Sequence, residues 1–255
     1  MDAPHLQELI DLEEGYWWHV AKRRLAVEIL QRYLPAPGLL VEGGLGSGRN
    51  LREFQRLGYE VAGLDIMPES VARARQVGLP DAYLHDLTEP WPIAPGTVRA
   101  VVMLDVLEHV PDPIRTLSHV VATLRDDGGV VITVPAYPRL YSQWDRKLGH
   151  YLRYTSSELL RQTAAAGLQP LYEGHWNSFS VPAALVSRKL RRSGSDDDGA
   201  VFPRVPRLLN QMLIGCAWVE RFVLRRVRVP IGLSLVGVFV KQGNASRACN
   251  EPASP

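Results

Sequence analysis

Cysteine is scarce in this sequence of 255 residues, which contains only Cys216 and Cys249. The two lie too far apart in the chain for a metal-binding or redox motif, so the scarcity excludes a disulfide-stabilised scaffold and indicates a reducing compartment. A long apolar run is lacking as well, because a charge-free apolar stretch such as residues 208–219 is shorter than the ~20 residues that a membrane span requires. We therefore predict a soluble, cytoplasmic protein.

An excess of charge of one sign is also missing. The formal net charge is +2, so no global field argues for nucleic acid as the main partner. Residues 1–14 are acidic and amphipathic, and they lack the basic region followed by an apolar core that marks a secretory signal. With 46% hydrophobic and 22% charged residues, the composition is that of a globular protein with one large domain, or one domain and an appendage.

The sequence does contain a glycine-rich turn that follows an apolar segment. Residues 39–43 are typical of a strand, Gly44, Gly46 and Gly48 form the turn, and residues 49–57 are typical of a helix. Glycine lets the backbone approach a ligand closely and adopt dihedral angles that a Cβ would forbid. Such a turn can bind any nucleotide-type cofactor, so an NAD-dependent enzyme is an alternative at this point.

Strands and helices alternate beyond this turn, and two helices precede it. The alternation predicts a Rossmann-like α/β fold with a mostly parallel sheet of seven strands covered by helices. Ligands of such sheets bind at the carboxyl ends of the strands. The other expected strands are 60–65, 82–85, 100–104, 130–134, 168–173 and 234–241, and the expected helices are 6–10, 25–30, 68–76, 112–124 and 156–166, with a turn at 126–129.

The chain divides into four parts on this interpretation. Residues 1–34 form an N-terminal helical entry segment, and residues 35–176 and 231–242 form the core. Residues 177–230 form a helical insertion before the last strand, and we expect the tail, residues 243–255, to be disordered.

The insertion is strongly basic. Between positions 186 and 229 it carries ten Lys and Arg residues against four acidic ones, next to Leu, Val, Phe and Trp. This pattern suggests a lid for a lipophilic substrate, or a peripheral contact with anionic lipid. The alternative is a helical cap that packs on the sheet and displays its Arg side chains to water.

Acidic residues stand where the first four strands end or soon after. Glu42 precedes the glycine turn, and Asp65 ends the second strand, where an acid can take both hydroxyls of a ribose. Asp86 follows the third strand and could accept a hydrogen bond from an exocyclic amine, and Asp105 follows the fourth. The plainer interpretation makes Glu42 a helix cap, and Asp65 and Asp86 ordinary turn residues.

The fourth strand runs into Asp105-Val106-Leu107-Glu108-His109-Val110. Residues 35–166 resemble the class I S-adenosylmethionine-dependent methyltransferases. The resemblance is carried by this segment, by the glycine turn, by the acidic residues at the strand ends and by Asp127-Gly128-Gly129. The resemblance implies that the glycines line the methionine and adenosine portion of the cofactor, that Asp65 binds ribose and that Asp86 binds the adenine amine. By this resemblance the cofactor-binding residues are Trp18, Glu42, Gly44, Gly46, Gly48, Asp65, Ile66, Asp86, Leu87 and Asp105.

Two residues depart from the family at the turn, namely Gly43 and Leu45. These departures leave open the alternative that the protein is a relative of the family that binds the cofactor for a role other than methyl transfer. Two further segments resemble a subgroup of this family that modifies small molecules such as sugars or lipids. They are Trp17-Trp18 with the basic residues that follow it, and the loop 135–155. Lys22 stands where that subgroup commonly has Arg, which puts a bidentate carboxylate clamp in doubt.

Two histidines are the candidate catalytic residues. The resemblance implies methyl transfer to a small or lipophilic acceptor, preferably at oxygen, with His109 or His150 taking the proton of the acceptor. The alternative for His109 is that it and Glu108 only brace the loop. Our prediction includes no metal, although Asp105, Glu108 and His109, completed by His150 or His119, offer a set of ligands that some related O-methyltransferases use for a divalent ion.

Overall fold

The computed structural model describes residues 12–182, 205–227 and 229–242. Seven strands form one sheet in the order β3-β2-β1-β4-β5-β7-β6, and β7 alone runs antiparallel to its two neighbours. The predicted seven-stranded, mostly parallel sheet is confirmed. The strands are β1 (Gly38–Gly43), β2 (Tyr59–Asp65), β3 (Ala82–Leu84), β4 (Val98–Leu104), β5 (Leu124–Pro135), β6 (Leu168–Trp176) and β7 (Ser234–Lys241).

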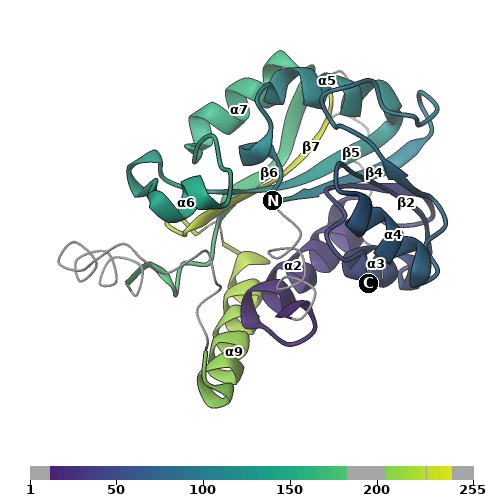
Figure 1. Ribbon diagram of the computed structural model, residues 1–255. Coiled ribbons are helices and arrows are strands. Elements are labelled where there is room, and N and C mark those ends of the chain that lie inside the picture. The colour runs from purple at the N-terminus through teal and green to yellow at the C-terminus, as the bar shows by residue number, and fades with distance from the viewer. Residues whose placement is uncertain (1–11, 183–204, 228, 243–255) are drawn as a thin grey trace.

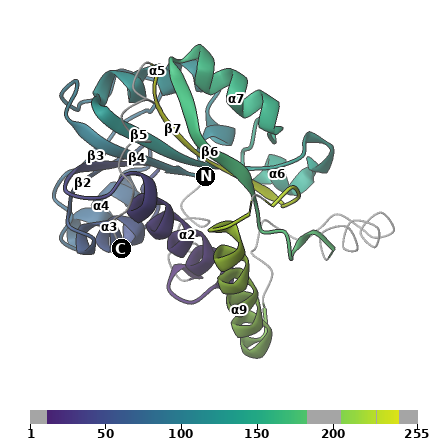
Figure 2. The ribbon, with the colours of Figure 1, turned by 180° about the vertical axis from the view of Figure 1, so that it is seen from behind.

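Helices cover both faces of this sheet, as Figures 1 and 2 show. One face packs against α2 (Trp17–Tyr33), α3 (Arg49–Arg56) and α4 (Pro68–Gln76), and the other packs against α5 (Pro113–Thr123) and α7 (Ser156–Ala165). The central strands are buried on both faces because their runs of Val, Leu and Ala meet a helical layer on each side. The remaining described elements are η1 (Leu107–His109), η2 (Pro138–Leu140), α6 (Gln143–Lys147) and α9 (Arg207–Leu224).

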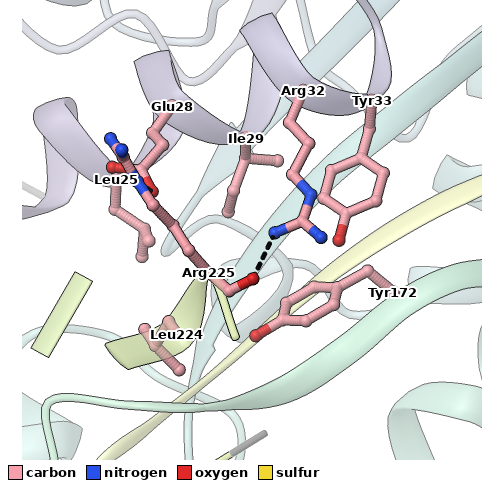
Figure 3. Close-up of a pocket in the computed structure, with 8 residues that line it drawn as sticks. All are labelled: Leu25, Glu28, Ile29, Arg32, Tyr33, Tyr172, Leu224 and Arg225. Carbon is pink, nitrogen blue, oxygen red and sulfur yellow. Dashed lines mark hydrogen bonds and ion pairs between the residues drawn. The ribbon is translucent and has the colours of Figure 1, made fainter. Parts of the chain in front are cut away.

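The helix α9 of the insertion packs against the entry helix α2, far from it in the sequence. Arg225 Nε lies 2.7 Å from Glu28 Oε1, and Arg32 Nη1 donates to the carbonyl oxygen of Arg225 at 3.0 Å (Figure 3). Only Ala217 and Leu224 of α9 belong to the apolar core, and the helix projects from the body of the protein (Figure 1). Within the predicted cap, residues 183–204 and 228 lie outside the described residues, and the described helix α9 contacts the entry helix more than it contacts the sheet.

The sequence interpretation was wrong at one boundary. Residues 126–129 were predicted as a turn, but β5 begins at Leu124 and includes them. The two glycines allow close pairing, because a Cβ on Gly128 would lie 2.6 Å from the carbonyl oxygen of Val98, and one on Gly129 would lie 2.7 Å from that of Phe239. The predicted helix 6–10 and the tail 243–255 lie outside the described residues.

Candidate functional site

The glycine turn between β1 and α3 brings bare backbone to the end of β4. Gly44, Gly46 and Gly48 all have positive φ, in the region that L side chains rarely adopt. A Cβ on Gly44 would lie 2.7 Å from Cγ2 of Val106, so no larger residue fits there. Val106 therefore packs directly against the backbone of the turn at Gly44, and a role of the turn toward a ligand stays a prediction.

The departure at Leu45 has a structural reason. Its side chain is fully buried and points away from the turn into the core, where it lies over Gly63 of β2. Gly43 is the last residue of β1, and Leu87 packs over it. A Cβ on Gly43 would lie 3.4 Å from Cδ1 of Leu87. Both departures concern packing beneath the turn and leave its open side unchanged.

Asp65, at the end of β2, holds the turn in place. Its Oδ2 accepts a hydrogen bond from Gly46 N at 3.2 Å, and its Oδ1 accepts one from Met67 N at 2.8 Å. Burial raises the pKa of this carboxyl, while these backbone hydrogen bonds oppose the rise. The neighbouring side chain of Ile66 is 65% exposed beside it. A carboxylate with two oxygens at this position has lone pairs left for a ligand.

Glu42 is buried under the same turn. Asn50 Nδ2 donates to its Oε1 at 2.8 Å, and its Oε2 has no hydrogen-bond partner among the described residues. Burial raises the pKa of Glu42 from 4.5 to about 8, so the carboxyl is mostly protonated at neutral pH. A buried acid with an unused oxygen is suited to a cationic or hydrogen-bond-donating ligand.

This burial makes stability depend on pH. The unfolded chain releases the proton of Glu42 near pH 4.5 and the folded chain near pH 8, so the favourable contribution is complete below pH 4.5 and is lost as pH rises through 8. We expect Glu42→Gln to stabilise the ligand-free protein, relative to wild type, by on the order of 3 kcal/mol more at pH 8 than at pH 5. Chemical denaturation at both pH values measures this difference. The exposed acid Glu60 provides the control, since Glu60→Gln should give no such difference; an equal result for both variants would contradict the assignment.

Asp86 lies on the exposed loop after β3. It accepts hydrogen bonds from the backbone N and the Oγ1 of Thr88, at 2.9 and 2.8 Å, and these bonds lower its pKa. This is the geometry of a turn residue, which was the plainer interpretation. The carboxylate is nevertheless ionised and exposed, and Leu87 beside it is buried against the turn. A role for Asp86 and Leu87 toward a ligand stays a prediction.

Asp105, at the end of β4, pairs with the entry helix. Its Oδ2 lies 2.9 Å from Lys22 Nζ, and its Oδ1 accepts from Thr133 Oγ1 at 2.9 Å. Burial alone would raise the pKa of Asp105, but the Lys22 ammonium outweighs it and holds the pKa below the usual range. The sequence did not predict this pair, because the two residues are 83 positions apart. Asp105 also has a left-handed φ of 58°, which marks strain at a strand end.

Trp18 lies on α2 next to this ion pair. Its ring stacks on Trp176 at the end of β6 with the centroids 4.8 Å apart, and Lys22 Nζ lies 6.0 Å from its centroid. The stacking fixes α2 on the sheet, so Trp18 has a packing role. A cofactor-binding role for it stays a prediction.

Three side chains gather beyond Asp105, from η1 and from the loop after α6. Ligand atoms of Glu108, His109 and His150 lie within 4.8 Å of one another, so the three could hold a metal ion. Asp105 is not part of this trio. His119, the other candidate from the sequence, is bonded to the carbonyl oxygen of Thr88 instead.

Burial changes the pKa of two members of this trio, Glu108 and His109. Glu108 is fully buried, and neither of its carboxylate oxygens has a hydrogen-bond partner among the described residues. Burial and the nearby Asp105 raise its pKa well above the usual range, which disfavours the ionised form. Burial, together with His150, lowers the pKa of His109 to about 4, so His109 is neutral and a weak base. The two imidazole rings meet edge to face at 4.6 Å.

His150 has the partners that orient a base. Its Nδ1 lies 3.1 Å from Oδ1 of Asp145, and Arg153 Nε donates to the same oxygen at 2.7 Å. Asp145 is fully buried; burial would raise its pKa, but the bonds from His150, Arg153 and Ser142 hold it far below the usual range. The sequence analysis missed Asp145 and Arg153. The available signal was their place in the loop 135–155, with Ser142 and Asp145 at capping-box spacing.

Comparisons with known proteins identify the family of this chain. A family model described as a methyltransferase domain matches residues 17–173. A ubiquinone biosynthesis O-methyltransferase of Xanthomonas axonopodis pv. citri (strain 306) is 27% identical over 169 residues, which cover 64% of each chain. The enzyme of that name from Paramagnetospirillum magneticum is 35% identical over 100 residues, 37% of this chain and 39% of its own. The chain thus matches less than two thirds of the length of these relatives.

Solved structures share the fold. A putative methyltransferase from Haloferax volcanii, in complex with the Trm112 activator, superposes with a TM-score of 0.60 at 22% identity, covering 91% of this chain and 92% of its own. A geranyl diphosphate C-methyltransferase from Streptomyces coelicolor superposes with a TM-score of 0.57 at 16% identity, covering 87% and 78%. At these identities the likeness concerns the fold alone.

Proposed function

The chain belongs to the methyltransferase-domain family, and from this premise we propose that it transfers the methyl group of S-adenosylmethionine to a hydroxyl oxygen of a small, lipophilic acceptor. One series of contacts carries the proposal. Gly44 of the turn faces Val106, and three residues further along the chain His109 meets His150 edge to face. The main chain of the glycine turn at Gly44, which we call the cradle, and the pair of imidazoles therefore both lie next to the segment that follows β4.

The residues at the turn fit the proposed cofactor. Gly44, Gly46 and Gly48 present main chain without side chains, and the buried Glu42 beneath them has one carboxyl oxygen without a hydrogen-bond partner among the described residues. Asp65 would bind the ribose and Asp86 the adenine amine, with Ile66 and Leu87 beside the base. When bound, S-adenosylmethionine would supply an electrophilic methyl group on a sulfonium, with S-adenosylhomocysteine as the leaving group. The protein contributes alignment of the two reactants.

The acceptor proton goes to a base, and we assign this base to His150. Asp145 holds His150 through Nδ1, which leaves Nε2 as the free ring nitrogen of the imidazole. His109 is the weaker candidate because its pKa is lowered to about 4. In this assignment His109 and Glu108 lie beside the His150 ring and help to position it.

The relatives support oxygen as the atom that is methylated, since their names describe O-methyltransferases. A lipophilic acceptor agrees with the apolar and basic character of the insertion, and peripheral contact with a membrane belongs to the same proposal. None of the helices in the described ranges is long and apolar enough to cross a membrane. Nucleic acid is not part of the proposed substrate class.

Binding and turnover test the proposal together. We expect calorimetry to detect binding of S-adenosylhomocysteine and no binding of NAD, because Gly48 follows Gly46 by two residues, whereas a dinucleotide turn has its third glycine one position later. We expect label transfer from methyl-labelled S-adenosylmethionine to a member of a panel of hydroxylated lipids and glycans. Preferred binding of NAD would overturn the assignment of the cofactor. Tight binding of S-adenosylhomocysteine without transfer to any acceptor would favour a relative that has another role.

A further inference from the structure

The exposed apolar side chains of this protein are concentrated on and just beyond α9. Nine of the twelve large ones in the described ranges lie between positions 208 and 231. An isolated exposed apolar side chain is ordinary, whereas a contiguous set marks an interaction surface. The nine are Leu208, Leu209, Met212, Trp218, Val219, Phe222, Val223, Val227 and Ile231.

Four of these residues define what we call the outer face of α9: Leu208, Met212, Val219 and Phe222. At 100° per residue they lie within a narrow sector on the side opposite Ala217, which is buried against the core. Their exposed fractions run from 76% at Leu208 to 49% at Phe222. The outer face therefore extends along most of the helix.

The opposite side of α9 is anchored by polar contacts. Asn210 accepts from Trp17 N at 2.8 Å and donates to the carbonyl oxygen of Gly15 at 2.8 Å. Glu220 accepts from the backbone N atoms of Asn177 and Ser178, at 2.9 and 2.6 Å. Turning the outer face inward would break these contacts, so the helix is held with its apolar side outward.

The charges around the outer face have one sign. Arg207 stands at the start of α9, and Arg225 and Arg226 follow its end, with the Arg226 guanidinium 4.4 Å from the ring centroid of Phe222. The only acid between positions 205 and 231 is Glu220, which is buried and engaged on the inner side. Pairing of this face with itself in a symmetric dimer would bring like charges together at its basic end. An anionic lipid surface offers the matching charge and an apolar layer beneath it.

We propose that the outer face of α9 docks on an anionic lipid surface, with its apolar side chains at the boundary of head groups and acyl chains and its arginines on the phosphates. The docked helix is joined through Asn210 to the start of α2, which carries Lys22 of the Lys22–Asp105 pair. Docking would thus hold the candidate site close to the phase in which a lipophilic acceptor dissolves. The docking makes specific the membrane contact named with the proposed function and does not depend on methyl transfer, whereas that last consequence does.

Vesicle flotation tests the docking on the full chain. We expect binding to vesicles of phosphatidylglycerol and phosphatidylcholine, weakened by salt, and little binding to pure phosphatidylcholine. Arg207→Gln with Arg226→Gln should lower the partition coefficient about 20- to 30-fold, and Val219→Ser with Phe222→Ser by about tenfold or more. The matched controls are Arg161→Gln on α7 and Leu84→Ser on β3, which are exposed and remote from α9 and should leave binding unchanged.

Circular dichroism and cooperative thermal unfolding verify that each variant is folded. Absence of wild-type binding to anionic vesicles, or binding that the α9 substitutions leave unchanged, would overturn the proposal. A wild-type dimer in light scattering that Phe222→Ser converts to a monomer, without vesicle binding, would assign the face to a second copy of the chain. A protein that floats with vesicles yet transfers no methyl group would retain the docking and refute the proposed function.

Discussion

Replacing Gly44 by alanine is expected to lower the affinity for S-adenosylhomocysteine by at least about 30-fold. Two costs add at this position: a left-handed φ of 82° and a Cβ placed 2.7 Å from Val106. Each costs on the order of 1–2 kcal/mol or more, so the turn must shift to relieve them, and a shifted turn no longer presents its backbone to the ligand. Calorimetric titration measures the loss.

Gly96→Ala is the matched control for this substitution. Gly96 also has a positive φ, 70°, but a Cβ there would meet nothing within 4 Å. It shares the backbone strain without the steric conflict, and it lies outside the site. If the two variants bind equally well, the proposed cradle at Gly44 is wrong; if only Gly44→Ala fails while its thermal unfolding stays cooperative, the cradle is supported.

Replacing His150 by glutamine is expected to lower kcat by about 100-fold or more and to leave the affinity for S-adenosylhomocysteine unchanged. Removal of a positioned general base has an effect of this size, and His150 is the imidazole that a buried, ionised carboxylate orients. Methyl transfer to the acceptor identified by the panel gives kcat and KM separately. His85→Gln on the exposed loop after β3 is the control and should retain full activity.

A chelator separates a base from a metal ligand. If His150 acts as a base, the wild-type enzyme keeps its activity in a chelator. Activity that is lost in chelator and restored by a divalent ion would instead make Glu108, His109 and His150 a metal site. In that case the assignment of His150 as the base is wrong.

Local patterns in the sequence were sufficient for the sheet and for the turn. Apolar runs such as the one in β4 predict strands buried on both faces, and glycines at positions 44, 46 and 48 predict a turn that only glycine can form. The acid at position 65 was placed correctly at a strand end, because strand ends follow from the same pattern. The position of the antiparallel β7 beside β5 and β6 did not follow from it, since strand order depends on contacts between residues 58 to 111 positions apart.

The sequence by itself determined the fold class and the set of backbone and acidic groups at the carboxyl ends of the strands, because periodicity and glycine placement act over a few neighbouring residues. Tertiary structure alone decided which of the candidate side chains act together. It joined Lys22 to Asp105, gave His150 its carboxylate from Asp145, and left His119 apart. Burial also decided protonation, since Glu42, Glu108 and His109 differ from their usual pKa mainly through desolvation, which depends on the packing around each group and on no feature of the local sequence.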